Sequence, residues 1–207
     1  MRIEKLSEGA EAQIYSTHFL GIDSVIKKRM RKAYRINAID EKIRTQRTKD
    51  EARIMSLVSS TPINAPKVLL VDKYEIVMNR IYGENLNRIL DLGRKLNTMK
   101  KIFAIIGKYA AILHNNNIVH GDYTPANFMV GKDNSVYLID FGLSDITSSI
   151  EDKALDLLLM KRSLDKKSFD EFIKAYSALS KDGKIIIDRL RQIEKRGRYN
   201  TRTLMTK

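Results

Sequence analysis

The fold of this chain is decided by residues 118–142, which read IVHGDYTPANFMVGKDNSVYLIDFG. Within this stretch, FMV and VYLID are short apolar runs typical of strands, and GKDNS between them predicts a hairpin turn. Polar residues gather at both ends of this hairpin: Asp122 and Asn127 come before it, and Asp140 closes it. The sequence therefore predicts a polar site where the two ends of the hairpin meet.

The spacing of these three residues indicates a phosphoryl-transfer site. Four residues separate Asp122 from Asn127, as in a catalytic loop that aims a carboxylate at a hydroxyl or water and an amide oxygen at a metal ion. Because the hairpin is short, we expect Asn127 and Asp140 to lie side by side as oxygen ligands of phosphate-bound Mg²⁺. Each residue alone is more typical of a turn or cap than of a metal ligand, but the combination with DFG favours the catalytic interpretation.

The flanking sequence predicts an α+β protein with two lobes. Residues 1–82 contain five strand-like runs, RIEKL, AQIYSTHF, SVIKK, KVLLVDKY and EIVMNRIY, and one long helical pattern from residue 40 to 59. Residues 83–195 contain helical patterns at 86–92, 99–114 and 151–194, the last broken near 163–167 and 182–183. We therefore expect a five-stranded antiparallel N-terminal lobe with one helix, and a mostly helical C-terminal lobe that carries the catalytic loop and DFG. Residues 196–207 are basic and aperiodic, and we expect a mobile tail.

Two lysines in SVIKKR are candidates for a phosphate-binding cation. Lys27 and Lys28 face opposite sides of a strand, so alternation alone does not choose between them. The likeness of VIK to the kinase V-A-I-K motif favours Lys27, and Glu51 on the long helix is then expected to hold it by an ion pair. Taken alone, Glu51 is more typical of a solvated helical charge.

Composition excludes several classes of function. The chain has 43% hydrophobic and 30% charged residues, which is typical of a globular protein, and it has no Cys, which excludes disulfides, cysteine-based metal sites and a thiol nucleophile. His18, His114 and His120 lack the spacing of zinc ligands. A charged N-terminus and no run of 18 apolar residues predict a soluble cytoplasmic protein without a membrane partner. The net charge of +13 predicts attraction to polyanions.

Six separated motifs resemble one family. HGDYTPANFMV and IDFGLSD, preceded by EGAEAQIY, VIKKR, KAYR and TKDEAR, are similar to the small atypical protein-kinase-like subunit of the KEOPS complex, the PRPK family. The likeness runs from about Leu6 to Arg198 and implies a bilobal kinase fold with a reduced helical lobe. It also implies an ATP- and Mg²⁺-dependent Ser/Thr kinase or ATPase in the complex that makes threonylcarbamoyladenosine on tRNA. The implied partners are the threonylcarbamoyl transferase subunit, other KEOPS subunits and tRNA.

The resemblance implies a role for each site residue. Asp122 becomes the catalytic base or water-orienting carboxylate, Lys27 the catalytic phosphate anchor, and Asn127 and Asp140 the Mg²⁺ ligands. The residues expected to bind the nucleotide are Leu6, Gly9, Ala10, Glu11, Ala12, Ile14, Lys27, Glu51, Met78, Ile81, Asn127 and Asp140. The resemblance also implies that Arg196, Arg198 and Arg202, with Lys195 and the basic cluster at 27–35, contact tRNA, although composition alone is equally typical of a solvated terminus.

The chain also departs from ordinary protein kinases. Its first loop, SEGAEA, has Gly9 alone where kinases have three glycines, and we expect the carboxylate of Glu11 to act there through Mg²⁺ or Lys27. Gly121 replaces the Arg that reads a phosphorylated activation loop. Only ten residues separate Asp140 from Glu151 and no APE motif follows, so we expect the acceptor to be water or to come from a partner. Asp156 is expected to brace the backbone of the catalytic loop.

Three other interpretations are weaker. A small-molecule phosphotransferase of the aminoglycoside or choline kinase type shares HGD with an Asn five positions on, but DFG and the short chain argue against it. A non-catalytic nucleotide-binding scaffold is disfavoured because all five key residues are present together. A RIO-type kinase is the nearest relative, and IDFG argues against it.

Overall fold

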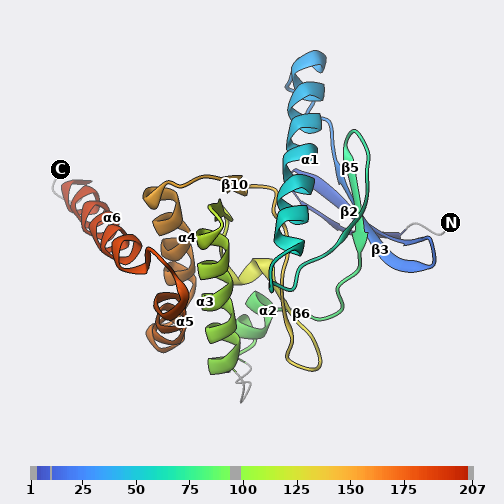
Figure 1. Cartoon of the computed structure of the whole chain (residues 1–207). Coiled ribbons are helices and arrows are strands. Elements are labelled where there is room, and N and C mark those ends of the chain that lie inside the picture. Colours follow the sequence, from blue (N-terminus) through green and yellow to red (C-terminus); the bar gives the residue numbers. More distant parts are fainter. Residues whose placement is uncertain (1–3, 10, 94–98, 205–207) are drawn as a thin grey trace. The chain divides into compact units, whose positions relative to one another are not determined.

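The computed structural model describes residues 4–9, 11–93 and 99–204, and the chain forms two compact units (Figure 1). The first unit comprises Met1–Glu84 and Met129–Leu143, and the second comprises Asn85–Phe128 and Ser144–Lys207. The chain therefore passes between the units more than once, because the segment 129–143 returns to the first unit.

The first unit is built on a five-stranded antiparallel sheet with the strand order β1-β2-β3-β5-β4. Its strands are β1 (Glu4–Glu8), β2 (Ala12–Phe19), β3 (Ile22–Arg29), β4 (Val68–Val71) and β5 (Glu75–Asn79). A two-residue turn at Leu20 and Gly21, with φ of 50° and 79°, joins β2 to β3, which is the turn geometry that matches the twist of a hairpin. The five strands and their antiparallel order confirm the predicted sheet.

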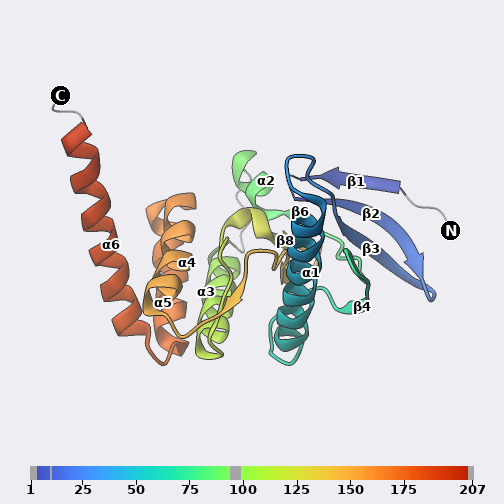
Figure 2. The same ribbon diagram turned by 90° about the horizontal axis from the view of Figure 1, so that it is seen from above.

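One long helix, α1 (Asn37–Ser59), packs against this sheet at β4 and β5 (Figures 1 and 2). Its buried apolar residues recur at helical spacing, namely Ala52, Ile54, Met55 and Val58. The helix begins three residues before the predicted start at residue 40 and ends at the predicted residue 59. The single helix of the N-terminal lobe is therefore confirmed.

The hairpin of β8 (Phe128–Val130) and β9 (Val136–Leu138) packs with the first unit, whereas the sequence analysis assigned it to the helical lobe. The backbone amide of Leu138 donates to the carbonyl oxygen of Asn64 at 2.9 Å, and the Asn64 side-chain amide donates to the carbonyl of Val136 at 3.3 Å. These long-range bonds tie the hairpin to the segment between α1 and β4. Asp140, which follows β9, accordingly belongs to the sheet unit.

The second unit is mostly helical. Its elements are α2 (Leu86–Asp91), α3 (Met99–Asn115), β7 (Ile118–Val119), the 3₁₀ turn η1 (Pro125–Asn127), β10 (Asp145–Ile146), α4 (Ile150–Ser163), α5 (Lys166–Leu179) and α6 (Gly183–Leu204), and the two-residue strand β6 (Glu84–Asn85) precedes α2. Helix α3 packs against α5 and α4 packs against α6, as Figure 2 shows. Ser149 and Asp165 cap α4 and α5 by accepting hydrogen bonds from backbone amides, which explains where these helices begin.

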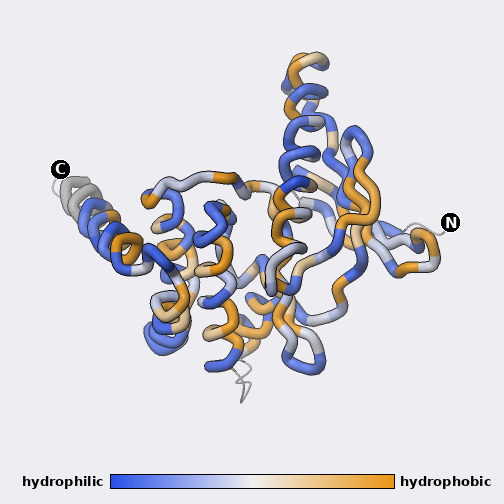
Figure 3. The backbone as a smooth tube through the Cα atoms, in the orientation of Figure 1, coloured by the Kyte–Doolittle hydropathy of each residue, from blue (hydrophilic) through white to orange (hydrophobic). Residues whose placement is uncertain are grey.

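Helix α6 continues past the predicted domain boundary at residue 195. The segment expected to be an aperiodic tail from residue 196 is helical as far as Leu204. Within residues 196–204 the three arginines and Leu204 are good helix formers, and the single Gly197 costs only about 1 kcal/mol, so the helix can continue without a regular apolar repeat. Figure 3 shows that the coloured part of α6, before this end, carries both hydrophilic and hydrophobic residues. Residues 205–207 lie outside the described part of the chain.

Across the described ranges, no helix combines enough length with enough apolar character to cross a bilayer.

Gly107 allows the close approach of α3 and α5, and its substitution tests this packing. A Cβ atom placed on Gly107 lies 2.2 Å from the backbone oxygen of Phe172 and 3.1 Å from Cβ of Ala175. We expect Gly107→Ala to lower the free energy of unfolding by about 1–3 kcal/mol, because overpacking outweighs the helix-propensity gain of about 1 kcal/mol. Urea denaturation measures this loss. The exposed neighbour Lys108→Ala is the control and should change stability by less than about 0.5 kcal/mol; a stabilised Gly107→Ala variant would contradict the packing.

Candidate functional site

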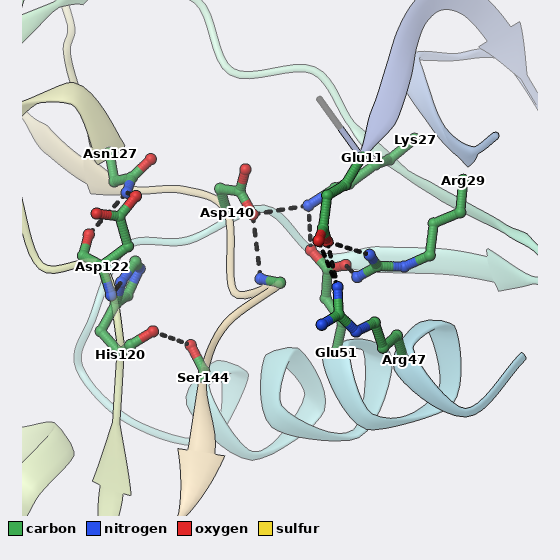
Figure 4. Close-up of polar contacts among 11 residues, drawn as sticks. Glu11, Lys27, Arg29, Arg47, Glu51, His120, Asp122, Asn127, Asp140 and Ser144 are labelled. Atoms are coloured by element: carbon green, nitrogen blue, oxygen red, sulfur yellow. Dashed lines mark hydrogen bonds and ion pairs between the residues drawn. The ribbon is translucent and has the colours of Figure 1, made fainter. Parts of the chain in front are cut away.

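Lys27 is buried on β3 and contacts two carboxylates (Figure 4). Its Nζ atom donates to Oε1 of Glu51 at 2.6 Å and to Oδ1 of Asp140 at 2.7 Å. Lys28 is half-exposed and pairs with Glu75 at 2.6 Å, and this hydrogen bond raises the pKa of Lys28. The predicted Lys27–Glu51 ion pair is therefore confirmed, and the structure resolves the choice that strand alternation left open.

Glu51 is shared between two cations. Its side chain is 2% exposed, and its second oxygen, Oε2, accepts a hydrogen bond from Nη2 of Arg29 at 2.6 Å. Arg29 is itself 4% exposed, and its Nη1 lies 3.4 Å from Oε2 of Glu11. A buried carboxylate is costly unless it is paired and hydrogen-bonded, and Lys27 and Arg29 together occupy both oxygens of Glu51.

Glu11 pairs with arginines in this structure, and its expected action through Mg²⁺ or Lys27 remains a prediction. Nη1 of Arg47 lies 2.5 Å from each Glu11 oxygen, and Arg29 approaches from the sheet (Figure 4). Partial burial raises the pKa of Glu11, but the hydrogen bond and charge of Arg47, with the charges of Arg29 and Arg35, together lower it below its ordinary value. Asp140, Lys27, Glu51, Arg29, Glu11 and Arg47 thus form one chain of alternating charges, which we call the charge chain.

Sequence reasoning missed Arg29 and Arg47, although both carried a signal. Arg29 follows Lys27 by two residues in the same strand, so strand alternation places it on the same face. Arg47 precedes Glu51 by four residues in α1, so it lies one helical turn away on the same side. A search for cations around Glu51 at these spacings finds both.

Several of the predicted nucleotide-binding residues share the sheet face of Lys27. Ile14 pairs directly with Lys27, Ala12 pairs with Arg29, and Met78 pairs with Val25, which lies two residues before Lys27. Because cross-strand partners point to the same face, Ala12, Ile14 and Met78 surround Lys27.

The other predicted residues lie around this face or outside the described chain. Leu6 is exposed on β1, Ile81 is half-buried beyond β5, and the amide of Gly9 donates to the carbonyl of Ala12 at 2.9 Å in the turn before β2. Ala10 lies outside the described residues. The nucleotide contacts assigned to these positions remain predictions.

Asp140 adopts a backbone conformation that few residues tolerate. Its φ angle is 61°, in the left-handed region, which Asp and Asn enter more readily than most residues. Oδ1 of Asp140 accepts the backbone amide of Gly142 at 3.0 Å as well as the bond from Lys27. A Cβ atom on Gly142 lies only 3.1 Å from this oxygen and 3.3 Å from Nζ of Lys27, so glycine leaves room for both.

In the second unit, Asn127 fixes the carboxylate of Asp122. The side-chain amide nitrogen of Asn127 donates to the backbone oxygen of Asp122 at 2.7 Å and to Oδ2 at 2.9 Å (Figure 4). The η1 turn sets this geometry, since the amide of Asn127 donates to the carbonyl of Thr124 at 3.0 Å. With the nitrogen used in this way, the amide oxygen of Asn127 points away from Asp122 and is the atom that can face a cation.

Asp156 braces the catalytic loop, as predicted. Its two oxygens accept the backbone amides of His120 at 2.7 Å and Gly121 at 2.9 Å. Gly121 has a φ of 77°, a backbone conformation that favours glycine. This conformation explains why glycine stands at a position where other kinases carry Arg. Ser144 adds a bond from its hydroxyl to the carbonyl of His120 at 3.0 Å.

Tyr123 anchors the same loop to α3. Its ring is fully buried, and its hydroxyl donates to the carbonyl of Ile106 at 2.7 Å. Burial, with a smaller contribution from Asp156, raises the pKa of Tyr123 well above its ordinary value. The uncharged Tyr123 side chain therefore holds the catalytic loop against α3 at the residue that follows Asp122.

The charge chain predicts strongly non-additive stability. Lys27→Met leaves Glu51 paired with Arg29, and Arg29→Met leaves it paired with Lys27, so each single variant keeps one cation on the buried carboxylate. We expect the double variant to lose about 1–3 kcal/mol more than the sum of the single losses, because Glu51 is then buried without a cation. Guanidinium denaturation of the four proteins measures this coupling. Adding Glu51→Gln to the double variant should recover stability, and simple additivity would show that Glu51 does not depend on either cation.

Comparisons with known proteins place the chain in a family. A family model described as RIO domain matches residues 12–170. The argument from IDFG against a RIO-type kinase is therefore wrong: these four residues are too short a stretch to outweigh a match over most of the chain. The crystal structure of the Rio2 kinase-ADP/Mg²⁺-phosphoaspartate complex from Chaetomium thermophilum is similar with a TM-score of 0.64 and 14% identity, covering 96% of this chain and 70% of that one. This likeness confirms the kinase-like α+β fold.

Two curated relatives define the group more closely. The KEOPS complex subunit Bud32 of Pyrococcus abyssi is 36% identical, over 97% of this chain and 98% of its own length. The probable bifunctional tRNA threonylcarbamoyladenosine biosynthesis protein of Methanococcus vannielii is also 36% identical over 94% of this chain, which spans only 36% of that relative. The chain belongs to the RIO domain family of atypical kinases and, by its likeness to full-length relatives, to the Bud32 family.

Proposed function

We propose that this chain is an ATP- and Mg²⁺-dependent ATPase or Ser/Thr kinase that acts with a threonylcarbamoyl transferase in the threonylcarbamoyladenosine modification of tRNA. The observation that carries the proposal is the buried Lys27, held by Glu51 and in contact with Asp140. An ion pair of this kind positions a lysine for the phosphates of ATP in kinases. The names of the Bud32 and bifunctional relatives support the link to tRNA modification.

Lys27 is the proposed phosphate anchor. Its ammonium is buried and fixed from two sides, so it keeps one position instead of sampling many. A cation that is already oriented loses little conformational freedom when an anionic ligand arrives, and desolvation strengthens its attraction to phosphate. Glu51 and Arg29 supply this orientation.

Asp122 is the proposed base or water-orienting group. The amide of Asn127 holds Oδ2 of Asp122, which leaves Oδ1 as the oxygen directed to a hydroxyl or water. Asn127 and Asp140 remain the predicted Mg²⁺ ligands, and their amide and carboxylate oxygens are donors of the type that Mg²⁺ prefers. The ion would neutralise charge on the phosphates of ATP. The acceptor is water in an ATPase and a Ser or Thr hydroxyl in a kinase.

Partner dependence distinguishes this proposal from an ordinary protein kinase. Only a short segment, 141–149, separates Asp140 from α4, so the chain offers little surface there for a peptide substrate. We propose that the transferase and other KEOPS subunits complete the working enzyme. The net charge of +13 supports contact with tRNA, since phosphate neutralisation dominates non-specific affinity for nucleic acids.

The turnover of [γ-³²P]ATP tests the proposed chemistry. We expect phosphate release by the wild-type chain to rise when the transferase and tRNA are added, and Asp122→Ala to lower it by at least about 100-fold, since a positioned base contributes roughly 10²–10⁴-fold. Free phosphate and labelled protein are measured separately, so release indicates an ATPase and label on protein indicates a kinase. The control is Asp145→Ala, an exposed carboxylate of β10. Turnover that is independent of Asp122 in every mixture would refute the catalytic proposal in favour of a nucleotide-binding scaffold.

The basic end of α6 is the proposed tRNA contact. Replacing Arg196, Arg198 and Arg202 by Gln keeps a helix-forming sequence, so the variant changes charge with little change in helix propensity. We expect weaker tRNA binding and a salt dependence, as log Kd against log salt, that is shallower by about 2–3, because each phosphate contact contributes roughly 0.7–0.9 to this slope. ATP affinity should be unchanged. An unaltered salt slope would place the tRNA contact elsewhere.

A further inference from the structure

A strongly basic cavity of about 230 Å³ lies within the first unit, among the loop before β2, the end of β3, residues 30–35 and the first half of α1. Its charged lining consists of Glu11, Arg29, Lys32, Arg35, Arg44 and Arg47. The volume is far larger than the roughly 10–15 Å³ that one water molecule needs. Five cationic side chains facing one cavity repel one another unless anions balance them.

Two buried carboxylates, Asp40 and Glu51, hold the guanidinium groups of Arg44, Arg35 and Arg29 in place. Asp40, fully buried in the first turn of α1, accepts Nε of Arg44 at 2.7 Å and the backbone amide of Lys32 at 3.1 Å, and Nη1 of Arg35 lies 3.9 Å away. Glu51 holds Arg29 in the same way, at 2.6 Å. The cations are therefore fixed from outside the cavity, and this is how proteins pre-organise a binding site for an anion.

Aromatic contacts add to this support. The guanidinium carbon of Arg44 lies 3.7 Å from the centre of the Tyr74 ring, so this side chain is stacked as well as ion-paired. Arg35 lies over the ring of the exposed Tyr34 at 5.3 Å. Arg44 and Arg35 thus each have both a carboxylate and an aromatic ring to orient them.

The local charges do not balance. The five cations face the buried Asp40 and Glu51 and the displaceable Glu11, which leaves an excess of two positive charges with Glu11 in place and of three once it is displaced. A phosphate monoester carries about −1.5 to −2 charges near pH 7, whereas a phosphodiester carries only one. The excess therefore matches a phosphate dianion better than a single link of a nucleic-acid backbone.

Glu11 already acts as an anion in this cavity. Its carboxylate binds Arg47 through both oxygens and approaches Arg29, yet its side chain remains 46% exposed at the turn before β2. A half-exposed carboxylate on a turn can move away at low cost, whereas the buried Asp40 and Glu51 cannot. The position of the Glu11 carboxylate marks where an external anion would bind.

We propose that this cavity is a binding site for a phosphate dianion, either inorganic phosphate or the terminal phosphate of a monoester, and that the ligand displaces Glu11 from Arg47 and Arg29. The site shares Glu11 with the residues predicted to bind the nucleotide, but its four arginines and Lys32 are not among them, and it does not depend on the proposed ATPase or kinase activity. Arg47 and Arg35 donate hydrogen bonds to the phosphate from the cavity wall. The Glu11 carboxylate competes with the phosphate for these cations and so limits the phosphate affinity.

Calorimetric titration with inorganic phosphate, in the presence of saturating ADP and Mg²⁺, tests the site. We expect Arg47→Gln to weaken phosphate binding about tenfold or more, as expected for the loss of a charge-assisted hydrogen bond. Glu11→Gln should tighten binding, on the order of tenfold, because the competing charge is gone. The matched control is Lys28→Gln, which removes one ion-paired cation outside the cavity and should leave binding unchanged.

Two oligonucleotide arms distinguish the sources of the phosphate. If an RNA with a 5′-phosphate binds more tightly than the same RNA with a 5′-hydroxyl, and Arg47→Gln removes the difference, the ligand is a terminal phosphomonoester. If the two RNAs bind equally and binding of inorganic phosphate depends on Arg47, the ligand is the free ion. Three results would overturn the proposal: no phosphate binding, complete displacement of phosphate by ADP, or equal losses in Arg47→Gln and Lys28→Gln.

Discussion

The rest of the first unit depends on one buried carboxylate, Glu51, which is held between Lys27 and Arg29. Both cations come from β3 and the carboxylate comes from α1, so this contact fixes the helix against the sheet by charge as well as by apolar packing. An unpaired carboxylate at this depth would be far more costly than either ion pair alone is stabilising. The contact also connects the Asp140 end of the hairpin to the basic cavity, because Lys27 and Arg29 each have a second acidic partner.

Much of this arrangement could be predicted from local sequence. The five strands and the helices follow from hydrophobic periodicity, which depends only on neighbouring residues. The Lys27–Glu51 pair and the support of the catalytic loop by Asp156 followed from motif spacing, and both are present in the structure. The association of Asp122 with Asn127 is likewise a local contact across five positions.

What could not be predicted depends on contacts between distant residues or on weak local rules. The hairpin joins the sheet unit through Asn64, about 70 residues earlier, and nothing in FMV or VYL signals that partner. The pairing of Glu11 with Arg47 was not predicted because charge attraction alone does not say which of several cations is nearest, and Arg47 is 36 residues away. The helical tail was missed because residues 196–204 carry no regular apolar repeat, and apolar periodicity cannot detect a helix without one.

The left-handed backbone at Asp140 has a consequence for how this protein can vary over evolution. Gly, Asn and Asp accept a φ near 61° at lower cost than other residues, so the first tolerated replacements at this position are Asn and Gly. Asn would retain the side-chain acceptor for the Gly142 amide while removing the charge opposite Lys27. A lineage that lost phosphate chemistry could therefore carry Asn at position 140 and keep the conformation of this loop. Val or Ile at the same position would instead strain the backbone and disrupt the loop.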